Sequence, residues 1–367
     1  MHYGRGRGKN RTFVPFVIKP FERPFVSQEG TPSFVKPLAV KSMARHSLAL
    51  RLPEVFDFDE DYDSAAIVIG IFRRALMENC RIGYIDFSMM KRISPACLTV
   101  FSCYADLWKD HQPQVTPWTH TWHPNILTSF EQIGFFDTLG FDKKQLPVSK
   151  GESPIRYMGL RKYSMDAPLI DIGIEAKTIR EEIEEFAKCS FNKQAMFASV
   201  TEAITNIKDH AYTSEVNVAL KRKWWLSVSY DSEQSILHVI IFDRGLGIPT
   251  TMLTSSKFMT FRKVYYQTNL KWSQRDRLEL AFERFRNPDA YARAVPVSSG
   301  RGNGCGDLLQ MVGAAKSNQG KSSFGMLSVI SQKARYTYVA DASNDDSATA
   351  ATHIPLEGTL LEWRITI

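Results

Sequence analysis

Three segments in the second half of the chain carry residue types whose spacing could do chemistry. The first is the stretch 202–211, EAITNIKDHA. On a helix, Glu202, Asn206 and His210 share one face, with Asp209 beside them. An amide oxygen is a ligand that Mg²⁺ accepts, and a carboxylate one turn away could polarise a water or hydroxyl for attack on a phosphate. The plainer interpretation is a solvated polar face beside the core.

The second segment, FDRGLGIP at 242–249, directly follows an apolar stretch that predicts a strand. At the strand end, Asp243 could accept a hydrogen bond from an exocyclic amine such as that of adenine. Gly245 and Gly247 would let the backbone turn and approach a flat ring without a Cβ clash. An ordinary Asp-Gly turn would give the same letters.

The third segment is SGRGNGCGD at 299–307, which precedes the apolar run LLQMV. Glycines at alternate positions expose backbone N–H groups, and the N-terminus of a following helix adds positive partial charge. Together they would make an anion cradle, although a flexible loop is the alternative. The segment lacks the Lys-Ser/Thr end of a P-loop and follows polar residues, so Walker and Rossmann sites fit badly. The glycines are Gly300, Gly302, Gly304 and Gly306.

The elements around these segments predict an α/β protein of two units. In the first unit, 41–146, strands and helices alternate, which favours a parallel layer. Residues 1–40 are interpreted as an extended basic arm, and 147–160 as a linker rich in proline and polar residues. In the second unit, 161–367, helices are expected at 175–189, 192–212 and 308–316. Strands are expected at 223–230, 235–242, 323–331, 335–340 and 359–367. An exposed loop is expected at 341–354.

Composition limits the partners and the compartment. The net charge of +7 and the pI near 9.0 permit contact with nucleic acid, but the excess is modest and such a partner is not favoured. The five cysteines are scattered, so neither a disulfide framework nor a zinc site is expected. No run of about eighteen apolar residues occurs, and the N-terminus has no apolar signal core. We therefore expect a cytoplasmic protein with no membrane partner.

The order of the three segments, completed by Gly358-Thr359 near the C-terminus, resembles the motif set of the GHKL superfamily of ATP-binding proteins. That set runs Glu-xxx-Asn, Asp-x-Gly-x-Gly-Ile-Pro, a glycine-rich loop before a helix, and Gly-Thr in the last strand. EAITNIKDHAY is similar to the corresponding segment of the anti-sigma serine kinases. The resemblance implies a Bergerat-type sandwich over 161–367, with a mixed, mostly antiparallel sheet, helices on one face, and a lid over about 249–303.

The resemblance also implies roles for residues, with ATP and Mg²⁺ as ligands. Asn206 would hold Mg²⁺, Glu202 would act as general base, and Asp209 and His210 would be polar neighbours of the nucleotide. Asp243 would read the adenine amine, supported by Thr359. The base pocket would include Gly245, Gly247 and Ile248, and the phosphates would meet Gly300, Arg301, Gly302, Gly304 and Gly306. A phosphate contact is also open to Lys257, Arg262, Lys263, Arg275 and Arg277.

The first unit resembles the STAS fold of anti-sigma antagonists, through YIDFSMMKRISPACLTVF at 84–101 and NILTSFEQIGFFDTLGF at 125–141. The serine that is phosphorylated in that family would lie at the start of the central helix, where Pro95 and Ala96 stand here. Ser94 precedes them and is predicted to be a helix cap. Phosphorylation of this unit in cis is therefore not expected.

Three functions follow from these resemblances. The first is a slow Mg-dependent ATPase switch that acts on a protein partner, as a monomer or homodimer. The second is a protein serine/threonine kinase of the anti-sigma type. The third is an adaptor that binds nucleotide without catalysis. A MutL- or gyrase-like role in DNA processing is less favoured, because no transducer domain follows residue 367.

Overall fold

The computed structural model divides the chain into two compact units, Met1–Glu152 and Ser153–Ile367. Each unit is described by itself. The residues that the structure describes are 47–77, 81–111, 119–141, 153–165, 171–188, 191–212, 222–254, 272–286, 305–318, 324–341 and 345–367. The predicted arm at 1–40 lies outside them.

The first unit contains two parallel strand pairs and four described helices, consistent with the predicted alternation. β1 (Ser47–Arg51) pairs with β3 (Arg81–Asp86), and β2 (Val55–Phe56) pairs with β4 (Arg92–Ile93). The helices are α2 (Tyr62–Met77), α3 (Pro95–His111), α4 (Pro124–Gln132) and α5 (Phe135–Leu139).

Local sequence explains where the helices of the first unit begin and end. The Ser94 hydroxyl accepts a hydrogen bond from the Cys97 backbone N–H at 3.3 Å, so it caps α3 as predicted. Residues 125–141 do not form one continuous helix, because Gly134 has φ +83° and separates α4 from α5. Aromatic rings then fill the core: the Phe101 ring lies 4.8 Å from that of Phe72 and 5.7 Å from that of Phe130.

The second unit is built on a five-stranded sheet of order β5-β6-β7-β9-β8, antiparallel throughout its described strands. The strands are β5 (Ile155–Ser164), β6 (Lys223–Asp231), β7 (Ile236–Asp243), β8 (Gly325–Ala340) and β9 (Asp345–Thr366). β5 begins inside the predicted linker 147–160, so this part of the linker prediction is wrong. Its side chains are mostly half-buried, which leaves a weak hydrophobic pattern at the sheet edge.

The loop predicted at 341–354 is also wrong from residue 345 onward. β9 starts at Asp345, and from that residue on it pairs with β8; Ala350, for example, pairs with Arg335. The two strands predicted at 323–331 and 335–340 are one strand, with a register shift around Gln332, whose φ is +55°. Polar, small residues can form a strand here because β8 supplies the backbone partners.

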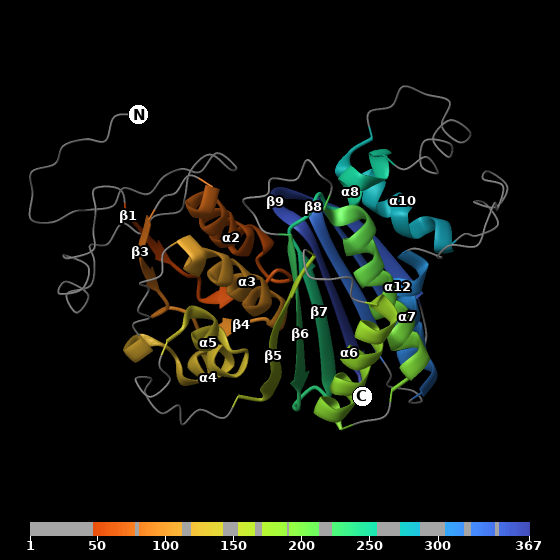
Figure 1. The fold of residues 1–367 in the computed structure, drawn as a ribbon, viewed down its shortest axis with the longest axis horizontal. Helices are drawn as coiled ribbons and strands as arrows, with labels where there is room; N and C mark the ends of the chain where they lie inside the picture. The colour runs from red at the N-terminus through yellow and green to blue at the C-terminus, as the bar shows by residue number, and fades with distance from the viewer. Residues whose placement is uncertain are drawn as a thin grey trace, which may run out of the picture. The chain divides into compact units, whose positions relative to one another are not determined.

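Three helices cover one face of this sheet (Figure 1). They are α6 (Ile172–Ala187), α7 (Lys193–Asn206) and α12 (Cys305–Asn318). Their apolar residues join one core with alternate residues of the strands, including Val200, Leu308, Val239 and Trp363. Asp171 and Asn192 cap α6 and α7 through their side chains.

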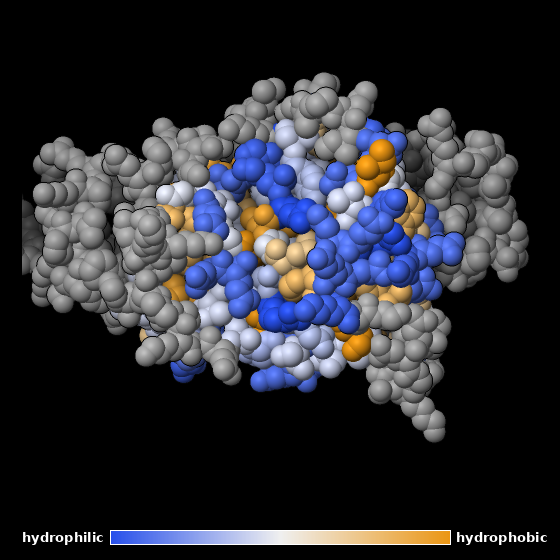
Figure 2. Space-filling view, turned by 60° about the horizontal axis from the view of Figure 1, so that its bottom comes forward, coloured by the Kyte–Doolittle hydropathy of each residue, from blue (hydrophilic) through white to orange (hydrophobic). Residues whose placement is uncertain are grey.

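Two short elements follow the central strands, within the region predicted as a lid. α8 (Ile248–Thr251) begins directly after the Asp243 turn, and α10 (Gln274–Arg286) packs on the β8–β9 hairpin, where the Phe282 ring stacks on Tyr336 at 4.2 Å. Hydrophilic side chains predominate on the face shown in Figure 2. Within the described ranges, the large hydrophobic side chains that remain exposed are Met89, Ile174 and Leu253. None of the helices described is long and apolar enough to cross a membrane.

Candidate functional site

The end of α7 carries the first predicted segment. Glu202 and Asn206 are both half-buried, and the Asn206 side-chain nitrogen donates to the Glu202 carboxylate at 2.9 Å. This bond uses the amide nitrogen and leaves the amide oxygen as an acceptor for a cation or water. The pair therefore presents an amide oxygen and a carboxylate next to each other.

The α-helix predicted over the whole of 192–212 is wrong at its C-terminal end. Residues Ile207–Ala211 form a π-helical turn, which has a wider spacing than the four-residue repeat assumed for His210. Asp209 and His210 are exposed, whereas Glu202 and Asn206 are half-buried. Asp209 and His210 lie within the π-helical turn, whereas Glu202 and Asn206 precede it, and such turns are frequent at functional sites.

Asp243, the last residue of β7, is buried at 4% exposure. Its carboxylate accepts the Gly245 backbone N–H at 2.7 Å and is also hydrogen-bonded by the Thr359 backbone. Burial raises the pKa of Asp243 to about 7, although these two hydrogen bonds act to lower it. The carboxylate is thus desolvated and held in place, and a further N–H donor would stabilise its charged form.

The Asp243 turn lies directly against the π-helical turn. The Leu246 backbone N–H donates to the Ala211 carbonyl at 2.9 Å. A Cβ on Gly245 would overlap that same carbonyl, so the close approach requires glycine. The Tyr212 hydroxyl accepts the Arg244 backbone N–H at 3.0 Å and donates to the Lys223 carbonyl. Two backbone segments that are far apart in sequence are therefore fixed to each other.

The predicted Gly358-Thr359 pair lies on the neighbouring strand, where Thr359 pairs with Asp243. Gly358 has φ +83°, and a Cβ there would overlap the Asp243 carbonyl. Ser331 of β8 connects the motifs. Its hydroxyl accepts the Ile248 N–H and donates to the Gly358 carbonyl, each at 3.0 Å. The same hydroxyl lies 3.0 Å from that of Thr359. Gly247, with φ +79°, precedes the first turn of α8.

The third predicted segment is described only in part. Gly300, Arg301, Gly302 and Gly304 lie outside the described residues, as do Lys257, Arg262 and Lys263. Gly306 lies in the first turn of α12, after Cys305, which is buried. Two of the arginines predicted as possible phosphate contacts are described: Arg277 donates to the carbonyls of Pro249 and Trp272, while Arg275 lies 4.0 Å from Glu279. In these positions Arg277 holds α10 to the start of α8.

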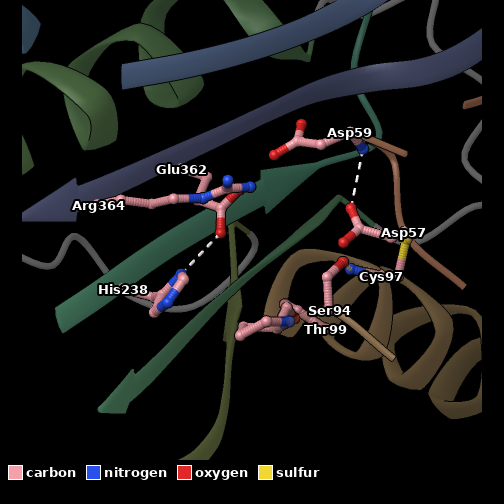
Figure 3. A network of polar contacts seen from close by, with 9 residues as sticks. Asp57, Asp59, Ser94, Cys97, Thr99, His238, Glu362 and Arg364 are labelled. Atoms are coloured by element: carbon pink, nitrogen blue, oxygen red, sulfur yellow. Dashed lines mark hydrogen bonds and ion pairs between the residues drawn. The ribbon is translucent and has the colours of Figure 1, made fainter. Parts of the chain in front are cut away.

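Sequence reasoning missed several buried polar residues of the second unit. Ser331 and Tyr212 connect the predicted motifs, and the strand pairing that brings Ser331 opposite Thr359 has no local signal in the sequence. A further group lies on the sheet face away from the helices, where His238 is hydrogen-bonded to Glu362 at 3.0 Å (Figure 3). Burial raises the pKa of Glu362, but Arg364 and His238 outweigh it and hold the pKa at about 2. The buried Glu362 carboxylate therefore has hydrogen-bond partners in both His238 and Arg364.

The raised pKa of Asp243 predicts that the free energy of unfolding of the nucleotide-free protein falls as the pH rises. The folded state binds the proton up to about pH 7, whereas the unfolded carboxyl releases it near 3.8. The stability contributed by the neutral form is therefore complete below 3.8 and lost as pH rises through 7. The stability of Asp243→Asn relative to the wild type should therefore rise from pH 5 to pH 8, by about 2 kcal/mol. Urea unfolding of both proteins at pH 5 and pH 8 measures this, and an equal difference at the two pH values would contradict it.

Comparison with known proteins adds no relative to this geometry: neither a protein-family model nor a curated protein matches the chain.

Proposed function

We propose that the second unit is a Bergerat-type ATP-binding domain of the GHKL superfamily and that the first is STAS-like. The protein would be a cytoplasmic regulator that binds ATP with Mg²⁺, hydrolyses it slowly and acts on a protein partner. One observation carries this proposal: the π-helical turn that follows α7 and the Asp243 turn are bonded backbone to backbone, through Ala211 and Leu246. The metal-binding and adenine-binding motifs are therefore neighbours, as one nucleotide site requires.

The residues at this junction fit the parts of a nucleotide. A buried carboxylate held by two backbone amides suits the adenine amine, because the amine donates to the charged form that burial penalises. Asn206 would contribute an amide oxygen to Mg²⁺. The bound metal ion would neutralise phosphate charge, and Glu202 would orient and deprotonate the attacking water.

The N-terminus of α12 supports the phosphate end of the proposal. Its first described residues, Cys305 and Gly306, continue directly from the glycine-dense segment. Backbone N–H groups at the start of a helix favour anions, and α12 is fixed to α7, the helix of Glu202 and Asn206, by the Ser199 hydroxyl. The anion-binding and metal-binding groups thus lie on two helices in contact.

A protein serine/threonine kinase is the alternative, favoured by the similarity of 202–212 to the anti-sigma kinases. Ser94 is a poor acceptor in cis, because it is 8% exposed and caps α3. The fate of the γ-phosphate tests the two functions: ATP labelled at that position is incubated with the protein, with and without candidate partner proteins. Free labelled phosphate is expected for the switch, label on a partner would indicate the kinase, and label in neither would leave only the adaptor.

A further inference from the structure

Ser199 of α7 connects this helix to α12 through its side-chain hydroxyl. It lies on the face of α7 that also carries Glu202 and Asn206, three and seven residues further along. Its side chain is fully buried, at 0% exposure. None of the predicted motifs includes it.

The Ser199 hydroxyl bridges two backbone groups of α12. It donates to the Asp307 carbonyl at 2.7 Å and accepts the Met311 N–H at 3.2 Å. These two groups are four residues apart, which makes them the natural partners of each other in an α-helix. The next carbonyl, that of Leu308, accepts the Trp363 indole N–H at 2.8 Å. The first turn of α12 is therefore fixed by side chains from α7 and β9.

Helix stability alone does not require this serine. If the hydroxyl were removed, the Met311 N–H and the Asp307 carbonyl could still satisfy each other within α12. What the hydroxyl adds is a set distance and orientation between α7 and the first turn of α12. That turn follows the glycine-dense segment, and α7 carries the residues that would meet Mg²⁺ and the attacking water.

We infer that Ser199 is a positioning residue, which aligns the phosphate-binding start of α12 with Glu202 and Asn206. This inference rests on the proposed ATP-binding function. Because Ser199 contacts neither the Asp243 turn nor residues 244–249 in any described hydrogen bond, its loss should affect the phosphate end of the nucleotide and spare the base. We therefore expect the loss of Ser199 to lower the affinity for the Mg²⁺-bound triphosphate more than the affinity for adenosine.

The test compares Ser199→Ala and Ser199→Cys with the wild type in the full chain. The probes are adenosine and a non-hydrolysable ATP analogue with Mg²⁺, measured by competition binding, together with ATP turnover. Ser199→Ala should weaken the analogue about 10-fold, the loss of one well-placed hydrogen-bonded contact, and lower kcat similarly. Adenosine affinity should stay within about 2-fold, and Ser199→Cys, with its weak S–H donor, should be intermediate. Ser227→Ala, at an equally buried serine of β6, is the matched control and should change none of these.

Two results would overturn the inference while leaving the proposed function intact. One is wild-type behaviour of Ser199→Ala with both probes. The other is an equal loss of adenosine and analogue together with a lower unfolding midpoint, which would indicate a purely structural role. If the wild type binds neither probe, the proposed function itself is wrong, and the inference falls with it.

Discussion

Asp243→Asn should weaken binding of an ATP analogue at pH 8 by at least about 100-fold. The carboxylate accepts the Gly245 N–H and is hydrogen-bonded by the Thr359 backbone, and the adenine amine would be a third donor. An amide offers one acceptor oxygen in place of two and adds a donor of its own. A buried donor that faces another donor is left unsatisfied, which costs the full desolvation penalty.

A matched control for this prediction lies at the far end of the same hairpin. Asp231 ends β6, is 7% exposed and accepts the backbone N–H groups of Glu233 and Gln234 at 2.9 and 3.0 Å. Asp231→Asn removes a similarly buried and similarly bonded carboxylate away from the proposed site. Its affinity for the analogue should equal that of the wild type. If Asp243→Asn binds as the wild type does, the adenine assignment is wrong.

Glu202→Gln should abolish most ATP turnover and leave nucleotide affinity within a few-fold. Glutamine keeps an oxygen that can accept the Asn206 amide N–H, which is bonded to Glu202 at 2.9 Å, so the geometry of α7 is retained. It cannot take a proton from water. Loss of a general base typically costs about 100- to 10,000-fold in rate.

The turnover assay compares labelled phosphate release by wild type, Glu202→Gln and Glu181→Gln. Glu181 lies on α6, is about half exposed and pairs with Arg180 and Lys177, so its change should leave the rate unaltered. Equal rates for wild type and Glu202→Gln would exclude Glu202 as the base. A rate of zero in the wild type, with nucleotide bound, would favour the adaptor.

The sequence was informative where periodicity is strong. α7, α12, β6 and β7 follow from apolar repeats, and the strand before Asp243 correctly predicts that the aspartate ends it. β5 was missed because an edge strand with half-buried side chains has little alternation. The start of β9 was missed because its small polar residues suit a loop equally well, and only pairing with β8 decides the outcome.

The junctions within the site were beyond prediction for a different reason. The π-helical turn interrupts a sequence whose four-residue spacing continues through it, so the spacing did not predict where the α-helix ends. Ser331 meets Thr359 across 28 residues, and Ser199 meets Asp307 across 108. Contacts of this kind depend on tertiary packing, which no local pattern encodes.

The most direct test of the proposal is whether the neighbouring α7 and Asp243 motifs bind a nucleotide. It is made by calorimetric titration of a non-hydrolysable ATP analogue with Mg²⁺ into the wild-type protein. We expect saturable binding at pH 8 that weakens at pH 6, because Asp243 takes up a proton as the pH falls below about 7. A guanine analogue should not compete. Absence of saturable binding up to about 1 mM at both pH values would show that these neighbouring motifs do not form a nucleotide site.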